Sequence, residues 1–434
     1  MTAKGRPLVE SALLLERARR VIPAFTQTLS KNPSQWVRGV APAYIARGSG
    51  AHLWDVDGNR YIDFPMALGP VILGYCHPAV DEAIARQLAD GIIFTLPHPI
   101  EVEVAERIVD LVPSAERVRF GKTGSDATSA AIRLARACTG RDGVLACGYH
   151  GWHDWYIGST SRALGVPAAV RALIGTFEFN DLASLEAALA VSDGSTAAVI
   201  LEPCGAVEPV PGFLEGVIAL AHAAGAVVVF DEIITGFRLA AGGAQERYGV
   251  QADLTAFGKA LGNGMPISAL AGRAELMDRL EEVFFSGTHG GEALSLAAAN
   301  AVLDQLDAEA YVQLFAKGEL LRRGIERAIE RSGLGEWVRI TGAAPRTVVT
   351  IREPDSAGSL LPAKSLVQQE LVKRGVLFNG SNFICLAHTT EDLEQAIDAY
   401  EAAFLRLADG LGGDLAELLE GPALRPAFRT VSSW

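Results

Sequence analysis

The sequence predicts an α/β protein with a mainly parallel sheet flanked by helices, plus a smaller α+β domain built from both chain ends. Two observations support this prediction. Short β-branched runs alternate with longer Ala/Leu/Arg-rich stretches between residues 66 and 310. Two of these runs, within AAVILEP and AVVVFDEI, are apolar on both faces, which is typical of buried central strands. We therefore expect a large domain at 66–310 and a small domain from 1–65 and 311–434.

Each expected element follows from a local pattern. Apolar residues at helical spacing predict an amphipathic helix over 13–21. The stretch 44–63 predicts a hairpin whose turn contains Asp57 and Gly58. Six β-branched runs in the middle of the chain predict strands at 117–120, 143–147, 197–201, 226–230, 254–257 and 267–271.

The chain after residue 310 predicts two long helices around one or two strands. The last helix is expected to begin at a cap formed by Thr389 or Thr390, with acidic residues in its first turn. The final stretch, 418–434, contains Pro and Gly. It is expected to be an extended tail that only a neighbouring chain would order.

Composition excludes several classes of function. The formal net charge is -13, from 51 acidic and 38 basic residues without a long Lys/Arg cluster, so nucleic acid is not an expected partner. The 5 cysteines are odd in number and never spaced as C-x-x-C, which predicts neither disulfides nor a metal site and fits a reducing cytoplasm. No segment approaches the roughly 20 apolar residues of a membrane helix, and no export signal is recognised.

Three segments carry the strongest chemical signal: GKTGSDA (121–127), VVVFDEIITGFR (227–238) and LTAFGKALGNGMP (254–266). Each segment contains or follows the end of a predicted strand. In parallel α/β sheets, ligands bind at the carboxyl ends of the strands. The three segments are therefore expected to converge on one ligand.

The glycine-containing segment offers an anion site. Gly124 and Ser125 follow one predicted strand and open a helical run, so free N–H groups and a hydroxyl would face a phosphate at a helix N-terminus. A purely structural alternative is that Ser125 or Asp126 only caps the helix.

The other two segments offer a carboxylate and an amine. Asp231 ends an apolar strand, where a buried carboxylate needs a cation or donors such as a protonated ring nitrogen. The structural alternatives are that Asp231 pairs with Arg238 or caps a turn. Lys259 lies in an apolar, Gly-rich stretch, where loss of hydration favours the uncharged, nucleophilic amine. The structural alternative is a solvated loop lysine.

A nucleophilic lysine, an acid for a ring nitrogen and a phosphate cup are the parts of a pyridoxal 5'-phosphate (PLP) site. The chain also resembles the class III (subgroup II) aminotransferases of PLP fold type I, particularly the branch around glutamate-1-semialdehyde aminomutase. The motifs that carry this resemblance occur in order along nearly the whole chain: WDVDGNRYIDF, GYCHPAV, TGSDATSAAIRLARACTGRD, YHGWHDW, LEPCGAVEP, FDEIITGFR, FGKALGNGMP, FSGTHGGEALSLAAA and LAHTTEDL.

The resemblance implies roles for individual residues. Lys259 would hold PLP as a Schiff base and act as the proton-transfer base, and Asp231 would keep the pyridine nitrogen protonated. Ile233 would press against one face of the ring and Tyr149 would stack on the other.

The remaining implied contacts concern the phosphate. Gly124 and Ser125 would bind it within the subunit. Thr288 would reach the phosphate of the partner subunit, which implies a homodimer with shared active sites.

Three departures distinguish the chain from the tetrapyrrole-pathway aminomutase. Val207, with Glu208 beside it, occupies a position that holds asparagine in the aminomutase branch; in several class III transaminases the same position holds a glutamate that pairs with a carboxylate-binding arginine. Leu68 replaces an aromatic residue of the aminomutase branch. The segment GVLFNGSNF, 375–383, is shorter than its counterpart and lacks an acidic residue.

These departures favour a ping-pong aminotransferase for a small, hydroxylated carbonyl or amine substrate. NPSQWVRGVAP and GGEALSL also resemble transaminases of amino-sugar, aminoglycoside and surface-polysaccharide pathways. Glutamate and 2-oxoglutarate would be the exchange pair, with Arg38 as a candidate anchor. An isomerase, either an aminomutase of the glutamate-1-semialdehyde type or an amine epimerase, remains the alternative. The candidate substrate contacts, each of which also has a structural interpretation, are Ser34, Gln35, Trp36, Arg38, His153, Asn379 and Asn382.

Overall fold

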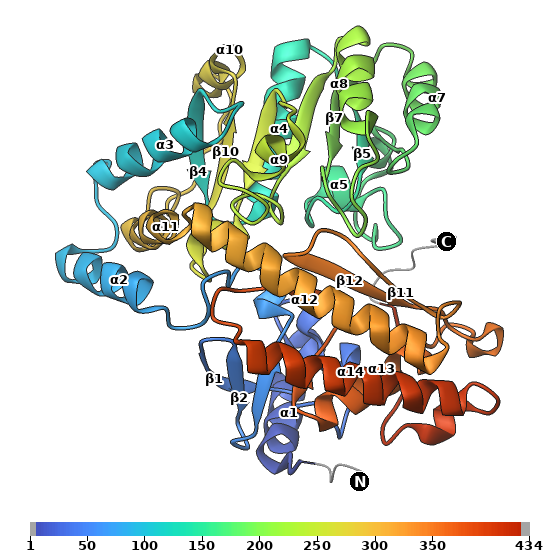
Figure 1. Cartoon of the computed structure of the whole chain (residues 1–434). Coiled ribbons are helices and arrows are strands. Elements are labelled where there is room, and N and C mark those ends of the chain that lie inside the picture. Colours follow the sequence, from blue (N-terminus) through green and yellow to red (C-terminus); the bar gives the residue numbers. More distant parts are fainter. Residues whose placement is uncertain (1–5, 427–434) are drawn as a thin grey trace. The chain divides into compact units, whose positions relative to one another are not determined.

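The computed structural model describes residues 6–426, which divide into two compact units (Figure 1). The large unit consists of residues 69–72 and 78–311, and the small unit contains the other described residues. Each unit has its own sheet and helices, and we describe the two units separately.

A seven-stranded sheet forms the centre of the large unit, with the strand order β4-β10-β9-β8-β7-β5-β6. Only β10 runs antiparallel to its neighbours, so the other strands end at a common edge. The six predicted strands are confirmed. The short edge strand β6 was not predicted, because a three-residue run is too short to show a pattern. The strands are β4 (Arg117–Gly121), β5 (Gly143–Cys147), β6 (Ile174–Thr176), β7 (Thr196–Leu201), β8 (Val227–Asp231), β9 (Leu254–Phe257) and β10 (Ser268–Gly272).

Both faces of this sheet are buried because its strands are apolar at nearly every position. Alternate side chains point to opposite faces of a strand. In β5, Val144 and Ala146 join a cluster with α4 (Gly124–Thr139). Leu145 packs on the other face against α7 (Leu182–Ser192) and α8 (Phe213–Ala223). Helices on both faces are what the apolar strand pattern predicts.

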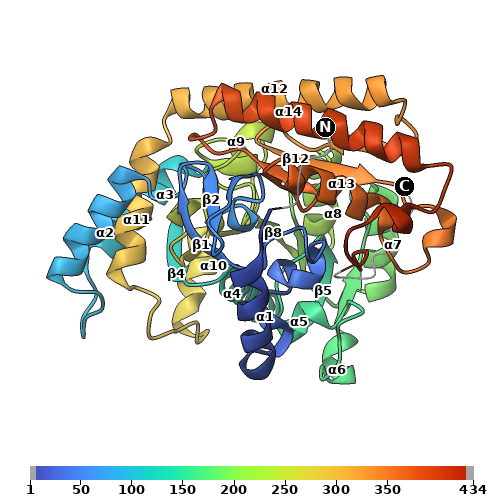
Figure 2. The same cartoon turned by 90° about the horizontal axis from the view of Figure 1, so that it is seen from below.

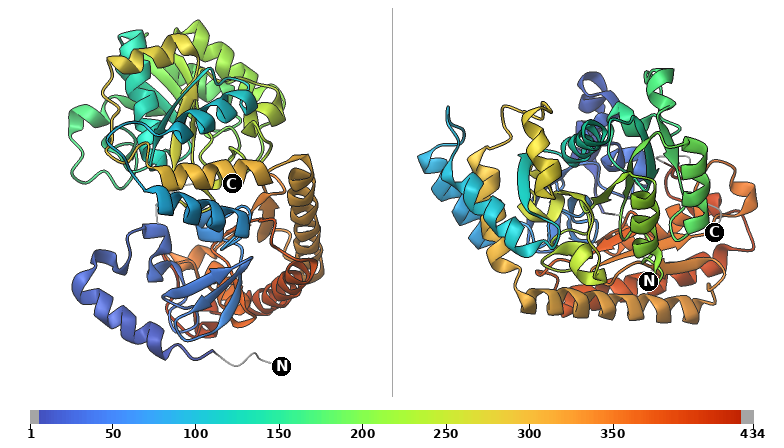
Figure 3. Two further views of the ribbon diagram at one scale, coloured as in Figure 1. Left: turned by 90° about the vertical axis from the view of Figure 1, so that its left-hand side faces the viewer. Right: turned by 90° about the horizontal axis from the view of Figure 1, so that it is seen from above.

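The large unit contains further helices, and Figure 3 shows helices on both sides of its strands. They are α2 (Pro78–Asp90), α3 (Pro99–Leu111), α5 (Asp154–Ile157), α6 (Ala168–Arg171), α9 (Gly243–Tyr248), α10 (Ala274–Met277) and α11 (Ala293–Gln305), with the short 3₁₀ turn η5 (Lys259–Gly262).

The small unit contains two sheets. The first has the order β1-β2-β3-β13, and the second has the order β11-β12-β14. The predicted hairpin is the β2–β3 pair, with Gly58 at a φ of 86° in its turn, and β1 adds a further antiparallel strand. The strands are β1 (Ile45–Ser49), β2 (His52–Asp55), β3 (Arg60–Asp63), β11 (Val338–Thr341), β12 (Arg346–Ile351), β13 (Val376–Leu377) and β14 (Ser381–Phe383).

Helices cover these sheets, and Figure 2 shows α12 and α14 running along each other. Thr389 is the N-cap of α14 and forms a capping box with Asp392, as the sequence predicted. The C-terminal part holds more elements than the two long helices and one or two strands predicted. Its helices are most of α12 (Ala308–Ser332), α13 (Pro362–Lys373) and α14 (Thr390–Gly410), with α1 (Val9–Val21) from the N-terminal part.

The prediction that only a neighbouring chain orders the tail is wrong for residues 418–426. The chain's own α13 orders this segment: Gln369 Nε2 donates to the carbonyl of Leu418 at 3.0 Å, and Leu424 N donates to Ser365 Oγ at 2.9 Å. Leu424 is also buried in a core cluster of the small unit. Burial of Leu424 and its hydrogen bond to Ser365 therefore order this segment, although Pro and Gly prevent it from forming a helix. Residues 427–434 lie outside the described part of the chain.

Candidate active site

The candidate site of the large unit lies at the carboxyl edge of its sheet. Asp231 is the last residue of β8 and pairs in register with Ala256 of the neighbouring parallel strand β9. Lys259 follows β9 by two residues and opens η5 with a φ of 42°, a left-handed conformation that is rare for lysine. The topology therefore places the predicted carboxylate and the predicted amine at the ends of adjacent strands.

Asp231 is 5% exposed, and its carboxylate has two partners. The backbone N–H of Ile233 donates to Asp231 Oδ1 at 3.1 Å, and His150 Nδ1 lies 2.8 Å from Asp231 Oδ2. Arg238, which the sequence offered as an alternative partner, donates from Nη2 to the carbonyl of Gly69 at 2.7 Å.

His150 is a site residue that the sequence analysis missed. Its ring is 2% exposed, and its Nε2 lies 3.1 Å from the carbonyl oxygen of Cys147. Both ring nitrogens therefore lie within hydrogen-bonding distance of an oxygen atom, which fixes the orientation of the ring. The one available sequence signal was that His150 directly follows the selected Tyr149. A buried histidine in the core is otherwise indistinguishable from this one in a single sequence.

The side chain of Ile233, which belongs to the segment 227–238, lies close to the other two predicted segments. A Cβ atom on Gly124 would lie 3.1 Å from Ile233 Cδ1, and a Cβ on Gly258, next to Lys259, would lie 3.2 Å from the same atom. The two glycines thus let the start of α4 and the lysine turn approach the Ile233 side chain closely. A flat ring placed against Ile233 would contact all three segments.

Helix α4 begins with free backbone N–H groups beside Ser125. Its cap is Thr123, which forms a capping box with Asp126, so Ser125 is not the cap. Ser125 is 8% exposed, and its Oγ accepts from Trp152 N at 3.3 Å. Gly151 has a φ of 103°, and a Cβ there would lie 2.3 Å from Ser125 Oγ, so only glycine fits at that position.

Tyr149 presents an accessible ring. The residue is 50% exposed, and the ring contacts Tyr156 edge-on with centroids 5.6 Å apart. Its backbone N–H donates to Glu202 Oε1 at 2.8 Å. Partial burial raises the pKa of Tyr149, and the charge of Asp231 raises it further. The neutral phenol is therefore retained at physiological pH, which suits a stacking surface.

These residues fit PLP by their chemistry. The cofactor needs an amine for its aldehyde, a carboxylate for its ring nitrogen, an anion site for its phosphate and an apolar wall for its ring. The structure supplies an amine at Lys259, the carboxylate of Asp231, the N-terminus of α4 and the side chain of Ile233. Within residues 6–426, no cluster of His, Cys, Asp or Glu could hold a metal ion.

Two further predicted residues line a separate cleft of the large unit, with a volume of about 400 Å³. Thr288 lines the cleft from the loop that precedes α11, and His153 lines it from the position just before α5. His153 Nδ1 lies 2.6 Å from Ser129 Oγ, which fixes the ring orientation. Lys122 forms an ion pair of 2.6 Å with Glu292 beside the same cleft.

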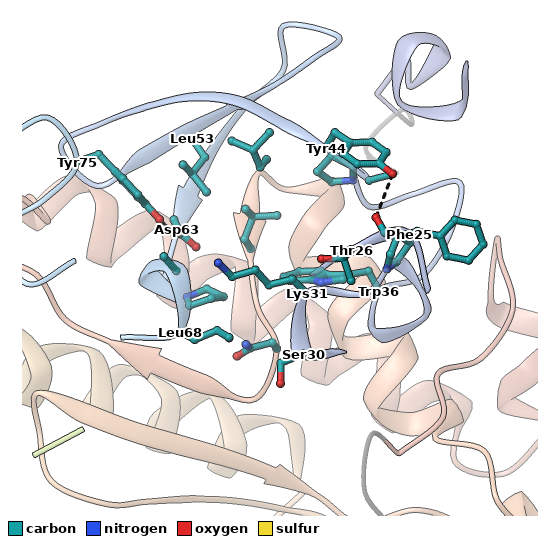
Figure 4. A pocket seen from close by; sticks show the side chains of 18 residues that line it. Phe25, Thr26, Ser30, Lys31, Trp36, Tyr44, Leu53, Asp63, Leu68 and Tyr75 are labelled. Carbon is teal, nitrogen blue, oxygen red and sulfur yellow. Dashed lines mark hydrogen bonds between the residues drawn. The ribbon is translucent and has the colours of Figure 1, made fainter. Parts of the chain in front are cut away.

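The predicted substrate residues of the small unit separate into two groups. Trp36 and Asn379 line a pocket of about 370 Å³, shown in Figure 4 and called the small-unit pocket below. Arg38 is exposed and is absent from the lining, whereas Lys31 is present and is the sole Lys or Arg among the described residues that line it. Arg38 as the anchor for glutamate therefore stays a prediction, and Lys31 is the cation that this pocket offers. Both arginine and lysine occur in the same polar segment, so the sequence alone could not separate them.

The other polar candidates of the small unit have structural partners. Gln35 Nε2 donates to the carbonyl of Arg425 at 3.2 Å. Asn382 is fully buried and accepts from Tyr400 at 2.8 Å. Neither residue, nor Ser34, lines the small-unit pocket.

Val207 and Glu208 differ in their surroundings. Val207 is 41% exposed, and Glu208 Oε1 accepts from both Arg247 and Tyr248 at 3.0 Å. Glu208 is thus held in a local network on the large unit. It does not replace the glutamate that is missing at position 207.

Comparisons with known proteins show which family the chain resembles. A family model described as aminotransferase class-III matches residues 35–389. A glutamate-1-semialdehyde 2,1-aminomutase of Syntrophobacter fumaroxidans is 38% identical, over 92% of this chain and 98% of the relative. A 3-aminobutyryl-CoA aminotransferase of Cloacimonas acidaminovorans is 35% identical, over 92% and 97%. The solved FumI protein of Sphingopyxis sp. MTA144, in its PLP form, is 31% identical over 93% and 97%, with a TM-score of 0.85.

Proposed function

The chain belongs to the class-III aminotransferases, a family of PLP enzymes with fold type I, and on that premise we propose that Lys259 binds the cofactor. The observation that carries this proposal is the meeting of Asp231, Lys259 and the start of α4 at one sheet edge. The resemblance to this family and to its aminomutase branch is confirmed by the comparisons.

We assign each contact a role toward the bound cofactor, which supplies a carbonyl for the amino group and a ring that withdraws electrons. Asp231 would keep a proton on the ring nitrogen, and His150 would orient the Asp231 carboxylate. Gly124 and Ser125 would bind the phosphate at the N-terminus of α4. Tyr149 and Ile233 would enclose the ring. The amine of Lys259 would hold the cofactor and would serve as the proton-transfer base.

We propose that the substrate is a small, hydroxyl-bearing carbonyl or amine compound, such as an amino sugar or an aminoglycoside precursor. Hydroxyl and amide groups in the small-unit pocket support this assignment, and Lys31 replaces Arg38 as the anchor for the acid group of glutamate or 2-oxoglutarate. The hydroxyl and amide groups that line it are those of Thr26, Ser30, Tyr44, Tyr75 and Asn379, and Asp63 adds a carboxylate.

Measuring the Michaelis constant for 2-oxoglutarate tests the anchor. Removing a charge-assisted contact in Lys31→Gln should raise this constant about tenfold or more. Arg38→Gln is the matched control and should leave it unchanged. Equal effects of both substitutions would contradict the assignment.

An aminomutase is the second candidate, because relatives with that name are 38% identical over 92% of this chain. Val207 and Leu68 argue against it, since both positions depart from the aminomutase pattern. The fate of the amino donor separates the two reactions. Release of one keto acid per amino donor supports transfer, whereas rearrangement of glutamate 1-semialdehyde without any donor supports the mutase.

We further propose a homodimer in the cytoplasm. Three consecutive apolar residues of the large unit, Ile92, Ile93 and Phe94, are 43–44% exposed, and Leu96 nearby is 77% exposed. A second copy of the chain would cover this surface and would bring its Thr288 to the phosphate. The five cysteines all lie in the described part of the chain and form no disulfide there, which supports a reducing compartment. Among the described helices, none is long and apolar enough to cross a membrane.

The decisive experiment for the cofactor site is reduction of the purified enzyme with borohydride, followed by peptide mapping. The label should lie on Lys259, and the visible absorption of the bound cofactor should disappear. A label on a different lysine would refute the site. Light scattering on the same sample should give a dimer, and an active monomer would refute the shared site.

A further inference from the structure

A strained turn forms one wall of the small-unit pocket. Met66, Ala67 and Leu68 have φ values of 42°, 55° and 75°, so three consecutive residues with side chains adopt the left-handed conformation. Each residue is disfavoured there, because its Cβ atom approaches the backbone carbonyl. Such a turn persists only where other groups hold it. Ala67 and Leu68 line the pocket, and Met66 is fully buried beneath it.

The group that holds this turn is the carboxylate of Asp63, at the end of β3. Asp63 is 2% exposed, and the backbone amides of Met66 and Ala67 donate hydrogen bonds to it. The hydroxyl of Tyr75 donates to Asp63 Oδ2 at 2.6 Å. Figure 4 shows Tyr75 reaching Asp63 from one side, with the amine of Lys31 on the other. A single buried carboxylate therefore binds two amides of the turn and a side chain of the pocket wall.

The rest of Asp63 is fixed by the sheet. Its backbone N–H donates to the carbonyl of Ala51 at 2.9 Å, and it pairs with Leu377 of β13, which also lines the pocket. The next residue, Phe64, is fully buried and stacks on His388 with ring centroids 4.7 Å apart. The carboxylate is thus a rigid point from which the turn is held.

We propose that Asp63 is a positioning residue that fixes the left-handed turn Met66–Leu68 and so determines which substrates fit the small-unit pocket. Without the carboxylate, the turn relaxes to a less strained backbone conformation. The side chains of Ala67 and Leu68 then no longer form the same pocket wall. Substrates that extend into the pocket then lose contacts, whereas substrates too short to reach it are unaffected. This inference rests on the proposed function of the pocket as the substrate site.

Hydrogen exchange tests the physical part of the inference without any reaction. In the full-length holoenzyme, Asp63→Ala should accelerate amide exchange in the peptide that contains Met66 and Ala67. Asp63→Asn keeps an oxygen acceptor of the same size and should restore part of the protection. Unchanged exchange in Asp63→Ala would overturn the proposal.

Kinetics test the functional part. Asp63→Ala should raise the Michaelis constant about tenfold for long, hydroxylated acceptors and no more than about twofold for pyruvate, while kcat for pyruvate is kept. Asp57→Ala is the matched control, because Asp57 also accepts from backbone amides, those of Glu10 and Ser11 at 2.7 and 2.9 Å, but does not line the pocket. The control should leave the preference unchanged.

The outcomes separate this inference from the proposed function. A parallel loss with short and long acceptors, or the same shift in the Asp57→Ala control, would overturn the role of Asp63. A wild-type enzyme that transfers no amino group to any acceptor would instead overturn the proposed function, and the exchange experiment would still decide whether Asp63 holds the turn.

Discussion

His150 allows a sharp prediction, because its two ring nitrogens have different partners and two substitutions separate them. In His150→Gln, the amide can take the place of Nε2 and keep the contact to the Cys147 carbonyl, but the contact of Nδ1 to Asp231 is lost. In His150→Asn, the shorter amide takes the place of Nδ1 and keeps the contact to Asp231. The contacts at stake measure 2.8 Å to Asp231 and 3.1 Å to Cys147.

The expected magnitude follows from the charge of the partner. A hydrogen bond to a charged group stabilises a protein by about 1.5–3 kcal/mol, against about 1 kcal/mol for a neutral pair. Asp231 is 5% exposed, so water does not replace the lost contact. His150→Gln should therefore lower the rate of amino transfer about 10- to 100-fold, since Asp231 no longer has a fixed orientation. His150→Asn should lower it less than about fivefold.

Single-turnover absorbance measurements with an amino donor give the rate, and denaturant unfolding of the holoenzyme gives the stability. Both variants should lose stability, because each loses one buried hydrogen bond of His150; the Cys147 carbonyl keeps the backbone N–H of Glu202 as a donor at 3.3 Å, so the loss in His150→Asn should be the smaller one. The rates alone distinguish the roles of the two nitrogens. Equal rates for His150→Gln and His150→Asn would refute the argument that His150 acts through Asp231.

Three other predictions concern the cofactor lysine, the acid limb of stability and the tail. Lys259→Arg replaces the amine with a guanidinium that forms no borohydride-reducible link to the cofactor, so labelling and keto-acid release should both disappear; persistent release would contradict the assignment. Burial lowers the pKa of His388 to about 4 from its usual 6.5, so the folded state binds this proton less readily than the unfolded state. Its contribution to stability is complete above pH 6.5 and should be lost by about 3 kcal/mol as the pH falls to about 4. His388→Asn keeps the acceptor for Cys385 N and should remove that part of the pH dependence in denaturant titrations, so an identical profile would count against it. Leu424 is 3% exposed, and Leu424→Ala should cost about 2 kcal/mol or more of unfolding free energy, whereas Leu405→Ala, at a position 44% exposed, should cost less than about 0.5 kcal/mol. Equal losses would show that the tail is not anchored by Leu424.

The sequence determined the fold class because strands with both faces buried leave an unmistakable run of apolar residues. All six strands predicted in the middle of the chain exist, including β7 and β8, which are buried at every position. The cap at Thr389 also followed from local chemistry, since the capping box needs only residues three apart. The sequence also identified Asp231 and Lys259 as candidates, because Asp231 ends one apolar strand and Lys259 follows another.

Tertiary structure alone decided the features that depend on residues far apart in the chain. His150 lies against Asp231 although 81 positions separate them, and no local pattern marks a histidine whose partner comes from another strand. Lys31 rather than Arg38 lines the small-unit pocket, because the path of an irregular segment decides which side chain points inward. The strained turn after Asp63 was likewise invisible, since Met66, Ala67 and Leu68 are residues that ordinarily avoid a positive φ. Local sequence specifies strands and caps, whereas convergence of side chains requires the folded chain.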